Sequence, residues 1–211
     1  MSDIEQLKLL PDWELYQLDI NPQALIRTLL EHEDLVNSHA HSQSLRYKAY
    51  HDYPINETLN TFTLMSVSND WYKLYEEIVL SIHRYFKKNN IDTQGLWLRT
   101  WPAILRGEEE HKSHSHKQWP FAGYVSLDAQ GSDTVYTDGK DGEEIYRIKN
   151  KPGQMYIGPG TTFHHVEKSK PYKQPRISVG YDIELSRNVV PNEYNFIPIP
   201  TYNLSKNISS I

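Results

Sequence analysis

The chain has 211 residues, of which 22 are basic and 27 acidic, and a formal net charge of −5 with histidine neutral. This length allows one domain with a buried core of useful size. Cysteine is absent, which excludes disulfides, thiolate nucleophiles and cysteine-ligated metal centres. A metal site in this chain would therefore have to use carboxylates and the 10 histidines.

No stretch approaches the ~20 apolar residues of a membrane span, and the N-terminus lacks the charged and apolar regions of a secretory signal. We therefore expect a cytoplasmic protein with no membrane contact. The acidic balance, without a long basic run, argues against strong nucleic-acid binding. Hydrophobic residues make up only 38% of the chain, and this fraction includes 15 Tyr and 5 Trp, whose bulk packs while the polar tip stays hydrated.

The N-terminal region, 1–94, predicts a mixed segment whose helices support the rest of the chain. Residues 13–20 alternate in polarity, as in a short strand. Asn21-Pro22 then supplies an N-cap and a first-turn proline for a helix. Apolar side chains recur at every fourth position over 69–88, which predicts a second helix.

A polar segment separates these two helices. Residues 37–60 show little periodicity and predict a loop. The loop contains His39-Ala40-His41, and no strand pattern follows this pair. We therefore interpret it as part of the loop rather than as a metal site.

Residues 95–189 predict the core of the protein, built from short strands separated by glycine- and proline-rich turns. Strands at a spacing of roughly 8–12 residues indicate an all-β sandwich or barrel. The tail, 190–211, is expected to wrap the surface, so that the chain forms one structural domain overall. The predicted strands span residues 96–101, 121–127, 134–137, 144–148, 154–157 and 176–183.

Histidines gather in two short windows of this β-rich part. His114 and His116 precede a predicted strand, and residues i and i+2 of an extended backbone point to the same side, so the pair can chelate one ion. His164, brought beside them by a rolled sheet, would complete three ligands on one face. His111 should point away from His114 and is the expected spare, and His165 should face away from His164.

A cationic side chain and a hydroxyl follow the second histidine window. Arg176 and Ser178 lie at i and i+2 of a predicted strand and share one face. A guanidinium fork beside a hydroxyl suits a carboxylate, which it binds with a bidentate pair and a third hydrogen bond.

These pieces, in this order and spacing, resemble the 2-oxoglutarate/Fe(II)-dependent oxygenases, and within them the compact prolyl-hydroxylase-like group. The resemblance covers the segment from Trp101 to Ile183 and implies a double-stranded β-helix, a cupin-like jelly roll, with Fe(II) at its open end. The matching pieces are Trp101, Gly107, His114-Ser115-His116, residues 121–127, Pro152-Gly153, residues 159–164 and Arg176-Ile177-Ser178.

The resemblance also implies roles for site residues. His114 and His164 would take the two histidine ligand positions. Arg176, assisted by Ser178, would pair with the far carboxylate of the cosubstrate 2-oxoglutarate, whose keto-acid end would chelate the iron. O2 would then oxidise a C–H bond, with release of succinate and CO2. No catalytic side chain beyond the metal ligands is expected.

The sequence departs from the family pattern at two positions. The family usually has Asp or Glu two residues after the first histidine, where this chain has His116. The site therefore has either three histidines or two histidines with a carboxylate from elsewhere. The family also often has Tyr at the position of Ser126, and Tyr124, on the same strand face, is the expected substitute near the cosubstrate. Candidates for the carboxylate are Asp128, Asp133 and Asp138.

The sequence thus predicts an Fe(II)- and 2-oxoglutarate-dependent hydroxylase, with a protein or peptide side chain or a free amino acid as candidate substrate. A cupin-type three-His metalloenzyme that does not use 2-oxoglutarate is one alternative, because Gly153, Pro159 and His164 match the second cupin motif. The glutamate that usually follows the first cupin motif is missing, which, together with Arg176, favours the oxygenase. A non-catalytic β-sandwich binding protein is the other alternative.

Overall fold

The computed structural model describes residues 13–33, 61–92, 94–117, 119–168, 170–185 and 196–200, so the predicted loop with His39-Ala40-His41 lies outside the described residues. Within them, no helix is long and apolar enough to cross a membrane. In chain order the elements are β1 (Glu14–Gln17), α2 (Pro22–Glu31), η2 (Thr61–Ser66), α4 (Asn69–Lys88), β2 (Leu96–Gly107), β3 (Phe121–Asp128), β4 (Asp133–Thr137), β5 (Glu144–Lys149), β6 (Gln154–Pro159), β7 (Phe163–Glu167), β8 (Tyr172–Leu185) and β9 (Ile197–Pro198).

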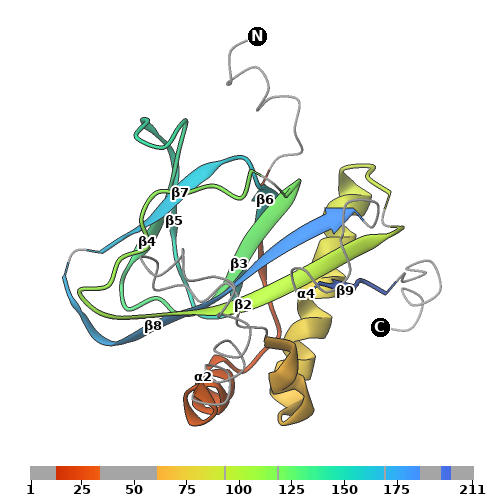
Figure 1. Ribbon diagram of the computed structural model, residues 1–211, viewed down its shortest axis with the longest axis horizontal. Helices are drawn as coiled ribbons and strands as arrows, with labels where there is room; N and C mark the ends of the chain where they lie inside the picture. Colours follow the sequence, from red (N-terminus) through yellow and green to blue (C-terminus); the bar gives the residue numbers. More distant parts are fainter. Residues whose placement is uncertain are drawn as a thin grey trace, which may run out of the picture.

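The strands form two antiparallel sheets that face each other (Figure 1). The larger sheet has the order β1-β6-β3-β8-β2-β9, and the smaller has the order β5-β4-β7. Between β2 and β8 the chain crosses repeatedly from one sheet to the other, so that strands distant in sequence become neighbours, as in a jelly roll. The fold is therefore mainly β, a double-stranded β-helix with helical support, as the sequence predicts.

The helices α2 and α4 cover one face of the larger sheet (Figure 1). Asn21 caps α2 as predicted, because its Oδ1 accepts a hydrogen bond from the Ala24 amide at 3.2 Å. Apolar side chains of both helices and of the sheet face pack into one cluster that forms the main core. Its members include Leu25, Leu29, Leu74, Ile78, Ile82, Val125, Ile157, Val179 and Ile183.

The opposite face of the larger sheet is turned toward the smaller sheet. Along β8 the side chains alternate between these two faces. Ile177, Val179, Tyr181 and Ile183 join the core under the helices. The alternate residues of β8 face the space between the two sheets. They are Arg176, Ser178, Gly180 and Asp182.

Strand β2 continues past the predicted end at residue 101 to Gly107, although Pro102 interrupts the pattern. Pro102 pairs with Val179 of β8, and β9 pairs only with Trp97 and Leu98 of β2. Within the described residues β2 therefore has a free edge at Pro102, where a missing N–H breaks no ladder bond.

Two strands in the described residues are absent from the sequence prediction. All side chains of β7 are at least partly exposed, so the strand shows no alternation that a pattern could detect. Strand β9 belongs to the tail and is only two residues long. Its neighbour Ile199 is 5% exposed and joins the main core.

Candidate metal and anion site

Three imidazoles meet at one end of the space between the sheets. His114 and His164 of β7 form an antiparallel bridge in which each amide donates to the other carbonyl, at 3.0 and 2.8 Å. His116 follows two residues later, and one nitrogen from each of the three rings lies within 4.8 Å of the others. The predicted ligands His114, His116 and His164 are thus brought together by a pairing that the sequence pattern does not reveal.

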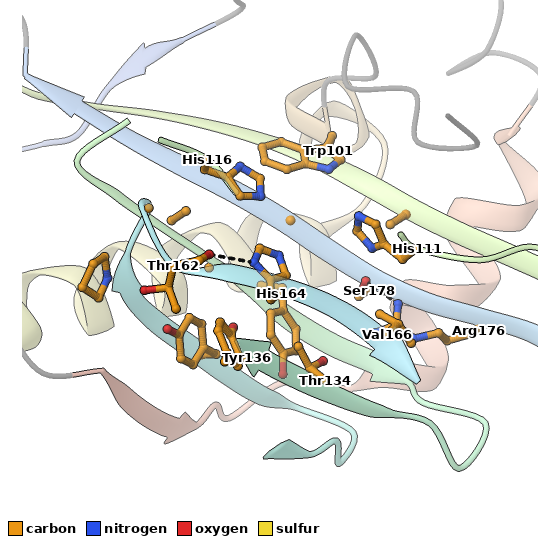
Figure 2. Close-up of a pocket in the computed structure, with 18 residues that line it drawn as sticks. Trp101, His111, His116, Thr134, Tyr136, Thr162, His164, Val166, Arg176 and Ser178 are labelled. Atoms are coloured by element: carbon orange, nitrogen blue, oxygen red, sulfur yellow. Dashed lines mark hydrogen bonds between the residues drawn. The ribbon is translucent and has the colours of Figure 1, made fainter. Parts of the chain in front are cut away.

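Each of these rings has an oxygen beside its Nδ1. The Lys112 carbonyl lies 2.8 Å from Nδ1 of His114. The Thr162 carbonyl lies 3.3 Å from Nδ1 of His164, a contact drawn as a dashed line in Figure 2. Because a carbonyl oxygen only accepts, Nδ1 of both rings must donate, and the lone pair is left on Nε2. Both rings therefore present Nε2 as the nitrogen free to bind a cation.

Burial keeps two of these imidazoles neutral. Desolvation, and then the neighbouring His116, lowers the pKa of His114 to about 4. Desolvation and the other imidazoles also hold the pKa of His164 well below its ordinary value. Neutral imidazole is the form that binds metal, so near pH 7 these rings need not release a proton to do so.

His116 has a carboxylate rather than a carbonyl behind it. Its Nδ1 lies 2.8 Å from Oδ1 of Asp182 on β8. The Trp101 indole stacks on the His116 ring, with the two ring centroids 5.7 Å apart (Figure 2). Gly180 allows this packing, because a Cβ there would lie 2.6 Å from the Trp101 ring. The orientation of His116 is therefore set by neighbours on β2 and β8.

A buried guanidinium lies in the same cavity. Arg176 is 2% exposed, and it donates from Nε to Ser132 Oγ and from Nη1 to Ser178 Oγ, both at 3.1 Å. No acidic side chain of the described residues forms an ion pair with it, and burial lowers its pKa. A buried cation without a counter-ion is costly, so this arrangement is suited to an anionic ligand.

The cavity between the sheets is lined by His116 and His164 of the cluster and by Arg176 (Figure 2). The cavity has a volume of about 40 Å³, measured over the positions that the centre of a water molecule can occupy. On this measure a single water molecule needs roughly 10–15 Å³. Predicted site residue Tyr124 lines it, but its hydroxyl donates to Asn150 Oδ1 at 2.6 Å. Burial raises the pKa of Tyr124 to about 12, so the hydroxyl keeps its proton.

None of the alternative carboxylates joins the imidazole cluster. The carboxylate of Asp128 accepts from Gln130, and that of Asp133 pairs with Arg147. Asp138 lies outside both the cluster and the cavity lining. Within the described residues the site is therefore a three-imidazole cluster without a carboxylate among its members.

His111 differs from the prediction that it points away from His114. Its ring stacks on His114 with centroids 4.3 Å apart, and it lines the cavity. The alternation rule fails because His111 precedes the bridge at His114 and is not in a strand. Its Nε2 is buried without a hydrogen-bond partner in the described residues, although it lies outside the group of three. His165 does not line the cavity, in keeping with the alternation along β7.

The sequence prediction also missed Asp182 and Arg99. The signal was present for Asp182, since it lies six residues after Arg176 on a predicted strand and so shares its face. Arg99 carries no such signal, because only the pairing of β2 with β8 places it opposite Asp182.

No family model matches the sequence, and no curated protein matches it. Solved structures with a similar fold include a Pseudomonas putida prolyl-4-hydroxylase, at 13% identity and a TM-score of 0.48, covering 86% of this chain and 92% of that one. The non-heme monooxygenase ThoJ, solved with nickel, has 10% identity and a TM-score of 0.49, covering 88% and 80%. An oxidoreductase of the 2OG-Fe(II) oxygenase family from Burkholderia pseudomallei has 14% identity and a TM-score of 0.39. That match covers 48% of this chain, which spans only 50% of the Burkholderia structure.

Proposed function

We propose that the protein is an Fe(II)- and 2-oxoglutarate-dependent oxygenase that hydroxylates a C–H bond of its substrate. One observation carries this proposal: two imidazoles of the three-imidazole cluster, His116 and His164, line the same cavity as the unpaired, buried Arg176. The first can hold a divalent cation and the second can hold the carboxylate of a cosubstrate.

The residues present fit an iron site. Imidazole nitrogen is a suitable ligand for Fe(II), and three ligands on one side leave positions for exogenous groups. The oxygens beside Nδ1 of His114 and His164 are the type of partner that metal-bound histidines have. When bound, Fe(II) would supply the activation of O2 that couples decarboxylation of 2-oxoglutarate to oxidation of a C–H bond.

The chain's own residues would bind and orient the cosubstrate. The Arg176 fork would pair with its far carboxylate, and Ser178, already bonded to the guanidinium, would add a hydroxyl contact. Burial of Arg176 strengthens this pairing, because few water molecules compete for the charge. The Tyr124 ring would form part of the wall, while its hydroxyl stays with Asn150.

A three-His metalloenzyme that does not use 2-oxoglutarate remains the second candidate, and one observation favours it. His116 is in the cluster at the position where the oxygenase pattern has a carboxylate. The buried Arg176 favours the oxygenase, because a metalloenzyme without an anionic cosubstrate has no need for an unpaired guanidinium there.

The experiment is a turnover assay of the purified protein with Fe(II), 2-oxoglutarate and O2, in which succinate is measured. We expect slow succinate release even without the prime substrate, and none without Fe(II). H164A should abolish it, whereas H165A, which changes the adjacent histidine outside the cavity, should retain it. Metal uptake without succinate release would favour the second candidate. Absence of stoichiometric metal uptake would refute both and leave a non-catalytic β-sandwich protein.

A further inference from the structure

Asp182 is a fully buried carboxylate that lies between the His116 imidazole and the Arg99 guanidinium. It is 0% exposed. Its Oδ1 lies 2.8 Å from His116 Nδ1, and its Oδ2 accepts from Nε and Nη2 of Arg99 at 2.7 and 2.6 Å. A buried carboxylate is costly unless it is paired. Arg99 pairs with Oδ2, whereas Oδ1 forms no hydrogen bond within the described residues and has His116 Nδ1 at ion-pair distance.

The position of this carboxylate is fixed by the sheet and by packing. Arg99 and Asp182 are directly opposite each other in the β2–β8 register. The Arg99 guanidinium also lies against three aromatic rings, with centroids 5.0 to 5.7 Å away. These rings are Trp101, Trp119 and Phe196. A guanidinium enclosed in this way holds Asp182 in one orientation, so the carboxylate presents Oδ1 to His116.

We propose that Asp182 is the positioning residue that makes His116 a metal ligand. By accepting the Nδ1 proton, Asp182 fixes the tautomer of His116 and leaves the lone pair on Nε2. This inference rests on the proposed metal site and assigns the third ligand position within it. The carboxylate that the oxygenase pattern has in direct contact with iron stands behind an imidazole in this chain.

The arrangement has a consequence for charge. Arg99 balances the charge of Asp182, so the pair adds no net charge beside a cation at the cluster. Removing the Asp182 charge would leave a buried guanidinium near the cation as well as an unfixed His116. Both effects weaken metal binding, whereas a role confined to joining β2 to β8 would alter only stability.

The test measures the dissociation constant of Co(II) alone by calorimetry, together with its visible absorption spectrum. In D182N we expect Co(II) to bind about 10- to 100-fold more weakly, with an altered spectrum. The matched control is E184Q, which neutralises another buried carboxylate of β8 that does not line the cavity. E184Q should bind Co(II) like the unsubstituted protein.

A second pair of variants separates positioning from folding. H116D puts a carboxylate at position 116 and leaves no imidazole there for Asp182 to orient. Only the charge effect then remains, so adding D182N to H116D should weaken Co(II) binding by a smaller factor than D182N does alone. Urea unfolding of each metal-free variant measures the free energy of unfolding alongside. A purely structural role predicts the same loss of affinity in both backgrounds.

The possible results distinguish the role of Asp182 from the existence of the metal site. Unchanged Co(II) affinity in a folded D182N, or the same loss in both backgrounds, would overturn the role of Asp182 and leave the metal site intact. Failure of the unsubstituted protein to bind Co(II) would instead overturn the proposed function, and this inference with it. A smaller loss in the H116D background than in the unsubstituted background would establish Asp182 as the positioning residue.

Discussion

Replacing Arg176 by methionine should separate ligand binding from stability. Methionine keeps much of the length of the side chain but removes the guanidinium, which is 2% exposed and pairs with no acidic group of the described residues. We expect R176M to lose affinity for 2-oxoglutarate and, at the same time, to stabilise the metal-free protein. The two effects have one cause, which is the unpaired buried charge.

The magnitudes follow from the contacts of Arg176. Truncating one partner of a buried, hydrogen-bonded charge pair costs about 2–5 kcal/mol, which corresponds to a roughly 30- to 5,000-fold rise in the dissociation constant of 2-oxoglutarate. Replacing a buried ion pair by apolar groups of similar volume is neutral or stabilises by about 1–4 kcal/mol, and removing the unpaired charge of Arg176 should act in the same direction. R176K should lie between, since it keeps the charge but loses the fork that reaches Ser132 and Ser178.

The assay is calorimetric titration of 2-oxoglutarate into Co(II)-loaded protein, with urea unfolding of the metal-free form. The control is R147M, because Arg147 on β5 is a partly exposed arginine that pairs with Asp133 and Glu144 outside the cavity. R147M should leave the dissociation constant unchanged. Unaltered 2-oxoglutarate affinity in R176M would refute the anion-site reasoning, and a lower free energy of unfolding would refute the charge argument.

Two further predictions concern the imidazole cluster and its packing. Since burial lowers the pKa of His114 from 6.5 to about 4, the unfolded chain binds a proton between these values that the folded protein does not. The contribution of His114 to the stability of the metal-free protein is thus fully present above pH 6.5 and falls by about 3 kcal/mol toward pH 4. Urea unfolding should find the pH dependence reduced in H114N. G180A places a Cβ 2.6 Å from the Trp101 ring, so unfolding free energy should drop by about 1–3 kcal/mol and Co(II) binding should weaken. G139A, with no atom within 4 Å of the added Cβ, should change neither, and an unaffected G180A would contradict the packing argument.

Local patterns were sufficient to predict the elements with strong periodicity. Helix α4 begins and ends where its apolar repeat and its basic end indicate, and α2 begins at the Asn21 cap. Strand alternation also places Arg176 and Ser178 on one face. These signals are carried by residues close in sequence, so no knowledge of the pairing between strands is needed.

The remaining features depend on contacts between distant residues. The partly exposed β7 has no period of its own and is defined by pairing with β4 and by the bridge from His164 to His114. Likewise, Arg99 meets Asp182 only through the β2–β8 register. The placement of His111 in the cavity arises from a segment without regular structure, for which the rule of alternation gives the wrong side.

The larger sheet has a different kind of packing on each of its two faces. One face packs under α2 and α4 and contains most of the aliphatic core. The other face encloses the cavity, where tyrosines supply the bulk and also carry polar atoms that need partners when buried. Those partners are present: the hydroxyls of Tyr146 and Tyr156 lie 2.7 Å apart, and Tyr124 donates to Asn150. A jelly roll whose helices already provide an apolar core can therefore keep the space between its sheets polar enough for three imidazoles and a guanidinium.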